Sequence, residues 1–80
     1  MDKIVKRDEN IIRKESLLKI REEVIGQLVS SEIDESYFRR KLIIEPGNQD
    51  AEAKVVGSTN NIKLLGETLE LVDTKLKELK

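Results

Sequence analysis

The sequence contains neither cysteine nor histidine. The chain therefore has no disulfide bond, no thiolate or imidazole zinc site, and no Ser-His or Cys-His catalytic pair. Aromatic residues are also scarce, because Tyr37 and Phe38 are the whole set, and Pro46 is the single proline. From this inventory we expect no enzymatic activity, no metal site and no cofactor.

Long hydrophobic runs are missing as well. The longest strictly aliphatic run is residues 42–44, whereas a membrane-spanning helix needs about 20 apolar residues. The first ten residues, MDKIVKRDEN, have no apolar core and so do not resemble a secretory signal. We therefore expect a soluble, cytoplasmic protein that does not enter a membrane.

The chain is small, and we expect residues 1–80 to form a single helical domain. A chain of this size buries only about 60% of the surface that its unfolded form exposes. Small domains are commonly stabilised by disulfides, by a structural metal or by association, and the composition leaves only association. We therefore expect a homo-oligomer, most simply a dimer.

Charge is abundant but nearly balanced. Fifteen Lys and Arg residues oppose sixteen Asp and Glu residues, which gives a formal net charge of -1. The charges are segregated, since residues 1–21 are net basic and residues 22–35 are net acidic. The net charge argues against general affinity for nucleic acid, while the segregation permits a local anion site.

Helical periodicity dominates the first half of the chain. The aliphatic residues on one half of a helical projection are Ile4, Ile11, Leu17, Leu18, Val24, Ile25, Leu28, Val29 and Ile33. This wide stripe predicts a helix over about residues 3–30. Ser31 and Asp34 resemble a capping box, which predicts a break near residue 30 and a short helix over about 32–44. Pro46 and Gly47 then predict a loop over 45–49.

A heptad repeat marks the last part of the chain and predicts a helix over about 50–79. Apolar residues alternate at spacings of three and four from Ile62 to Leu79, as in a coiled coil. Leu64 and Leu71 lie outside this seam, and we expect them to contact another protomer. The predicted interface residues are Ile62, Leu64, Leu65, Leu69, Leu71, Val72, Leu76 and Leu79.

Two all-α architectures fit these patterns: an antiparallel helical hairpin, or a three-helix bundle with a coiled-coil-like C-terminal helix. A parallel homodimer of the last helix is disfavoured, because Lys75 would face Lys80 of the second copy. A β-hairpin over residues 42–56 is an alternative local structure, but two strands alone are only marginally stable.

Two groups of basic residues are candidates for binding an anion. Arg7, Lys14 and Arg21 lie on one side of the first helix, where they either form salt bridges with Glu67, Glu70 or Asp73 or line an anion groove. The second group consists of Tyr37, Arg39, Arg40 and Lys41. These residues either stack on a base and hold a phosphate, or close the core and compensate the dipole of the helix. The candidate anion-binding residues are Arg7, Lys14, Arg21, Tyr37, Arg39, Arg40 and Lys41.

The sequence leads to two functional hypotheses. The first is a small non-enzymatic helical protein that self-associates and acts by binding a partner protein, in a regulatory, antagonist or assembly role. Small accessory proteins, including those carried by phages, commonly work in this way. The alternative is a module that binds or sequesters an anionic ligand, either a nucleotide or a nucleic-acid backbone.

Overall fold

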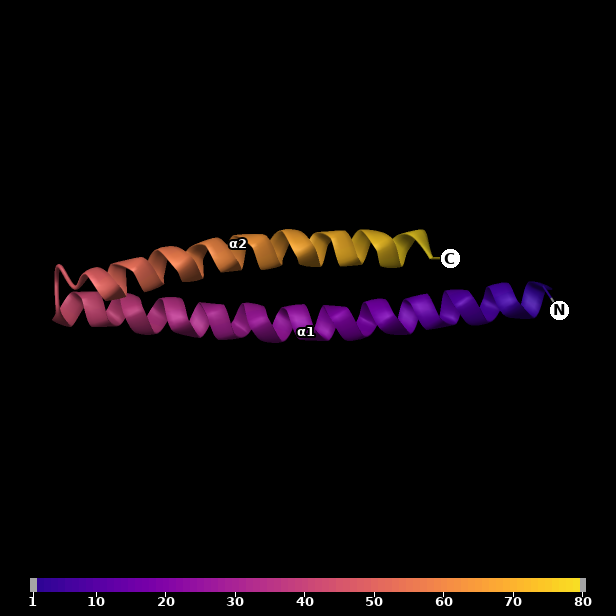
Figure 1. The fold of residues 1–80 in the computed structure, drawn as a ribbon, viewed down its shortest axis with the longest axis horizontal. Coiled ribbons are helices and arrows are strands. Elements are labelled where there is room, and N and C mark those ends of the chain that lie inside the picture. The colour runs from indigo at the N-terminus through magenta and orange to yellow at the C-terminus, as the bar shows by residue number, and fades with distance from the viewer. Residues whose placement is uncertain (1, 80) are drawn as a thin grey trace.

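The protein folds into two helices that pack side by side and run in opposite directions (Figure 1). Helix α1 spans Asp2–Ile44 and helix α2 spans Gln49–Glu78 in a computed structural model that describes residues 2–79, with side chains from residue 9 onward. The resulting rod measures 65 × 14 × 14 Å. The predicted all-α antiparallel hairpin is confirmed, and the three-helix alternative is not the one adopted.

Helix α1 is continuous, so the predicted break near residue 30 is wrong. The segment 32–44, which we expected as a separate short helix, is the C-terminal part of α1. Ser31 is partly buried in the contact with α2, between Leu28 and Glu35, which are also partly buried. Packing along α2 therefore keeps this segment helical in spite of its local capping signal.

The turn between the helices consists of residues 45–48. Gly47 adopts a φ of 87°, a left-handed conformation that glycine reaches without steric cost. Asn48 then caps α2, because its side-chain oxygen accepts a hydrogen bond of 3.1 Å from the backbone N–H of Ala51. Within residues 2–79 there is no strand, so the β-hairpin alternative is wrong.

The contact between the helices follows the heptad register. Most of the partly or fully buried positions on α2 and at its C-cap are spaced alternately four and three apart, and they are Ala51, Val55, Ser58, Ile62, Leu65, Leu69, Val72, Leu76 and Leu79. Gly66 and Asp73, just beside these positions, are also partly buried. The facing positions on α1 have the same spacing, and they are Leu17, Arg21, Val24, Leu28, Ser31, Glu35, Phe38 and Leu42. Together these residues form the seam of the hairpin.

The seam makes a thin core. Among the described side chains, the apolar residues that reach the buried class are Val24, Ala51 and Val72, and Ser58 is the buried polar residue. None of the large described side chains is fully buried. Two helices in contact along a single face shield little surface, so much aliphatic surface remains in contact with solvent.

Candidate functional site

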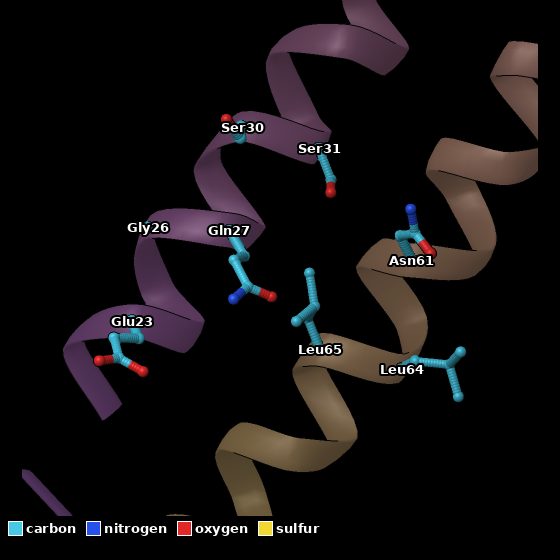
Figure 2. Close-up of a pocket in the computed structure, with 8 residues that line it drawn as sticks. All are labelled: Glu23, Gly26, Gln27, Ser30, Ser31, Asn61, Leu64 and Leu65. Atoms are coloured by element: carbon cyan, nitrogen blue, oxygen red, sulfur yellow. The ribbon is translucent and has the colours of Figure 1, made fainter. Parts of the chain in front are cut away.

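A groove runs along one flank of the hairpin, where the two helices leave space beside the seam. It has a volume of about 740 Å³, and its lining residues are Glu23, Gly26, Gln27, Ser30, Ser31, Asn61, Leu64 and Leu65. In Figure 2 the side chain of Leu65 points toward α1, whereas Leu64 points away from it. Small side chains on α1 make this groove open and shallow.

Leu64 and Leu71 form the apolar border of this flank, and we call them the α2 pair. Their side chains are 59% and 65% exposed, although the neighbouring Leu65 and Val72 face α1. The other six predicted interface residues all lie in the seam and are covered within the protomer. The α2 pair is therefore the part of the predicted interface that remains free to contact another molecule.

A second apolar strip lies on α1, on the opposite side of the seam. Ile11, Leu18 and Ile25 are spaced seven residues apart, and we call them the α1 row. Ile11 is 52% exposed, Leu18 is 44% exposed and Ile25 is partly buried. Ile4 continues the same spacing, although its side chain lies outside the described ones.

The α1 row belongs to the wide aliphatic stripe of α1, and the structure places it beside the seam. The stripe is wider than a single antiparallel partner can cover, so α2 shields only one part of it. The seven-residue spacing is visible in the sequence, but it does not reveal which part of the stripe faces α2.

A smaller cleft of about 410 Å³, lined in part by Ile12, Ile20 and Leu79, lies near the end of α2.

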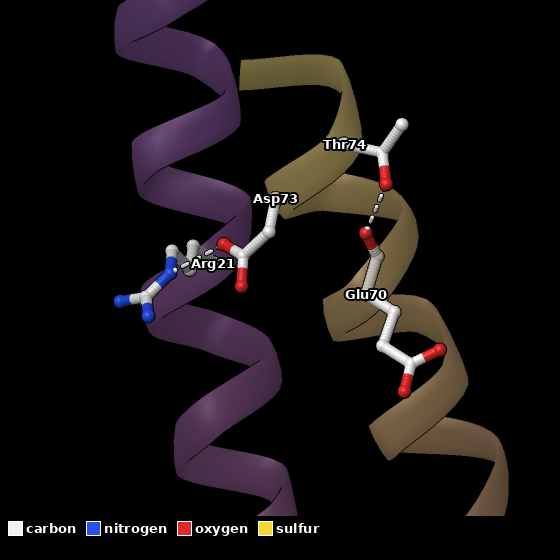
Figure 3. Close-up of polar contacts among 4 residues, drawn as sticks. All are labelled: Arg21, Glu70, Asp73 and Thr74. Atoms are coloured by element: carbon white, nitrogen blue, oxygen red, sulfur yellow. Dashed lines mark hydrogen bonds and ion pairs between the residues drawn. The ribbon is translucent and has the colours of Figure 1, made fainter. Parts of the chain in front are cut away.

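Arg21 is held by an ion pair across the seam (Figure 3). Its Nε donates a hydrogen bond of 2.9 Å to Oδ1 of Asp73, one of the three acidic residues predicted as partners. Both side chains are 42% exposed, so solvent screens the pair. The same figure shows Thr74 Oγ1 donating 2.9 Å to the backbone oxygen of Glu70 within α2. Arg21 therefore joins the two helices, as the structural interpretation expected.

Arg39 is also occupied within the protomer. Its Nε donates a hydrogen bond of 3.2 Å to Oε1 of Glu35, one turn earlier on α1. The other carboxylate oxygen of Glu35 accepts a hydrogen bond of 2.7 Å from the hydroxyl of Thr59 on α2. The Thr59 hydroxyl is the main cause that lowers the pKa of Glu35 below its ordinary value. Burial opposes it, and the hydrogen bond and charge of Arg39 add smaller lowering effects.

The remaining candidates for anion binding are not gathered in one place. Tyr37, Arg40 and Lys41 line a hollow of about 250 Å³ near the turn, but Glu45 lines it as well. Lys14 lies near the opposite end of α2, in a hollow of about 160 Å³ that Leu79 also borders. The side chain of Arg7 lies outside the described side chains, which begin at residue 9. The two groups thus occupy opposite ends of the hairpin.

The two aromatic rings do not form one flat platform. The ring centroids of Tyr37 and Phe38 are 5.0 Å apart, and the rings meet edge to face at 85°. Phe38 is partly buried in the seam, while Tyr37 is 60% exposed. This agrees with the expectation that one aromatic residue closes the core.

Among the described residues no cluster of three or more acidic, histidine or cysteine side chains has a geometry that holds a metal ion. The described part of the chain likewise contains no helix that is both long and apolar enough to span a membrane. No protein-family model, no curated protein and no solved structure matches this sequence.

Proposed function

We propose that this chain is a small non-enzymatic helical protein that self-associates and acts by binding a partner protein. The observation that carries the proposal is the amount of aliphatic surface outside the seam. The α2 pair and two members of the α1 row are all more than 40% exposed, on opposite flanks of the hairpin. Apolar surface of this kind on a small hairpin is typical of protein contacts.

The thin core supports the same proposal. An 80-residue chain without disulfides relies on its buried apolar surface for stability, and here three described apolar residues are buried. Each additional Leu or Ile that a second chain covers contributes about 1.5–3 kcal/mol. Association would therefore stabilise the hairpin as well as connect it to another molecule.

The alternative of an anion-binding module gains less support from the arrangement of the basic residues. Arg21 and Arg39 each have an acidic partner within the protomer, and the hollow that holds Arg40 and Lys41 includes Glu45. The cytoplasmic location predicted from the composition stays a prediction, as does the phage-like accessory role.

The proposal is tested by measuring the molecular mass in solution by sedimentation as the protein is diluted. We expect a dimer that dissociates on dilution. A matched pair of variants separates the two apolar surfaces: Leu64→Glu with Leu71→Glu, and Ile11→Glu with Leu18→Glu. At least one double variant should lose the contact with a second copy or with a captured protein. The proposal would be contradicted if both double variants kept their helices, kept the molecular mass of the natural protein in solution and still bound the same captured protein.

A further inference from the structure

We infer that the α1 row is the surface on which a second copy of this chain docks, with the two α1 helices parallel and in register. This inference rests on the proposed self-association and specifies its geometry. It differs from the sequence-based expectation, in which Leu64 and Leu71 make the contact between copies. The charges that border each surface distinguish the two possibilities.

Up to Leu18, the α1 row has a basic border on one side and an acidic border on the other, whereas Ile25 is followed at the same positions by Leu28 and Val29. On a helix the positions three and four residues after a given residue lie on opposite sides of it. Three residues after each of Ile4, Ile11 and Leu18 stands a basic residue, and four residues after each stands an acidic one. The basic residues are Arg7, Lys14 and Arg21, and the acidic residues are Asp8, Glu15 and Glu22.

This pattern is self-complementary in one orientation only. When two copies of α1 lie parallel, the basic border of each faces the acidic border of the other. Lys14 of one copy then lies beside Glu15 of the other, displaced along the axis by a single residue. In the antiparallel orientation basic borders face each other and acidic borders face each other, which is repulsive. The charges therefore select the parallel dimer.

The charged borders are available for this contact. Among the described side chains, the ion pairs within 4.0 Å do not involve Lys14, Glu15 or Glu22, and all three residues are exposed. Arg21 already contacts Asp73 through Nε, but its terminal nitrogens point away from Asp73 in Figure 3. An arginine has five N–H donors, so these nitrogens can reach a carboxylate of the second copy.

The shape of the hairpin leaves room for a second α1. The N-terminal end of α1 projects past the C-terminal end of α2 (Figure 1), so the backbone there has no neighbour in α2. Further along, the residue of α2 one heptad before Asp73 is Gly66, and a Cβ placed there meets no atom within 4 Å. No bulky side chain of α2 at this position limits the approach of the second copy.

The α2 pair lacks a comparable border. The residues three and four after Leu64 are Glu67 and Thr68, and those after Leu71 are Thr74 and Lys75. A parallel copy would place each charged residue opposite a threonine, so no ion pair forms. We therefore assign the α1 row to the second copy and leave the α2 pair, with its groove, to the partner protein.

Cysteine cross-linking of the full chain tests the orientation, because the natural sequence has no cysteine to interfere. Ile11→Cys and Leu18→Cys are made as separate variants and oxidised, alone and mixed. In the parallel dimer each variant alone forms a disulfide-linked dimer, because each cysteine lies beside the same cysteine of the second copy. Gln27→Cys, at an exposed residue of α1 that lines the groove on the opposite flank, is the control and stays monomeric on denaturing gels.

Three other outcomes of the cross-linking and sedimentation experiments would overturn the inference. A disulfide that forms only when the two variants are mixed indicates antiparallel helices and overturns the inference. A sedimenting dimer that cross-links at Leu64→Cys or Leu71→Cys, and not at residues 11 and 18, overturns it too. Both results leave the proposed self-association intact. A protein that stays monomeric at every concentration overturns the inference and the proposed function together.

A charge exchange gives an independent readout. Glu15→Lys places two cations beside each other in the parallel dimer, and we expect its dissociation constant to rise by roughly tenfold. Adding Lys14→Glu to the same chain restores opposite charges across the contact and should recover most of the affinity. A dissociation constant unaffected by Glu15→Lys overturns the assignment of the α1 row.

Discussion

Arg21 and Asp73 join the two helices by a hydrogen bond of 2.9 Å, although 52 residues separate them in the sequence. Arg21 occupies a seam position on α1, where a coiled coil usually has an aliphatic side chain. Asp73 lies just outside the seam of α2, next to the buried Val72. The pair therefore links the two helices next to Val72, one of the three described apolar residues that are buried.

The ion pair should contribute little free energy in spite of its position. Because both side chains are 42% exposed, we expect a coupling energy of about 0.2–1 kcal/mol between Arg21→Ala and Asp73→Ala. A double-mutant cycle on urea unfolding measures it. The pair Arg13 and Glu9, one turn apart on α1, provides a control within one helix. A coupling above about 2 kcal/mol would mean that the pair is far less hydrated than the structure shows.

The seam register predicts a contrast between two leucines only two residues apart. Leu69 is partly buried against α1, whereas Leu71 is 65% exposed. Leu69→Ala should lower the free energy of unfolding by about 2–3 kcal/mol, near the lower end for a leucine in a core. Leu71→Ala, the matched control, should change it by less than about 0.5 kcal/mol. Equal losses in chemical denaturation would show that the register is wrong.

Much of this fold was predictable because its determinants are local. The heptad spacing from Val55 to Leu79 identifies the seam of α2, and Pro46 with Gly47 identifies the turn. The continuity of α1 was not predictable in the same way, because Ser31 favours a helix start locally and is overruled by packing against α2. The exposed position of Ile11 and Leu18 depends on which part of a wide stripe α2 covers, and periodicity alone does not determine that.

The turn and the helix interior should respond oppositely to the same substitution. Gly47 has a φ of 87°, so Gly47→Ala introduces a strained backbone and should destabilise the protein by about 1 kcal/mol or more. Gly57 lies inside α2, where an added Cβ meets no atom within 4 Å. Gly57→Ala should therefore stabilise by about 0.5–1 kcal/mol. Thermal unfolding of the two variants compares them, and a stabilising Gly47→Ala would disprove the assigned turn.

Glu35 gives the hairpin an acid-sensitive contact. Its folded pKa lies below the ordinary value of 4.5, so the unfolded chain binds the proton more tightly than the folded one. The stabilisation is complete above pH 4.5 and is lost as the pH falls through the lowered folded pKa. Thr59→Val removes the strongest cause of the shift, and the pKa of Glu35 should move back upward in an NMR titration. An unchanged pKa in Thr59→Val would show that the hydroxyl does not hold the carboxylate.

The central claim is that this hairpin is completed by association with a second copy, and the thermal midpoint as a function of protein concentration tests it most directly. Folding coupled to dimerisation makes the midpoint rise with concentration, whereas a monomer has a constant midpoint. Across a roughly hundredfold dilution series we expect a steady fall in the midpoint, with sedimentation showing dimer at the concentrated end. A midpoint that stays constant across the series, together with a monomeric mass throughout, would contradict the account.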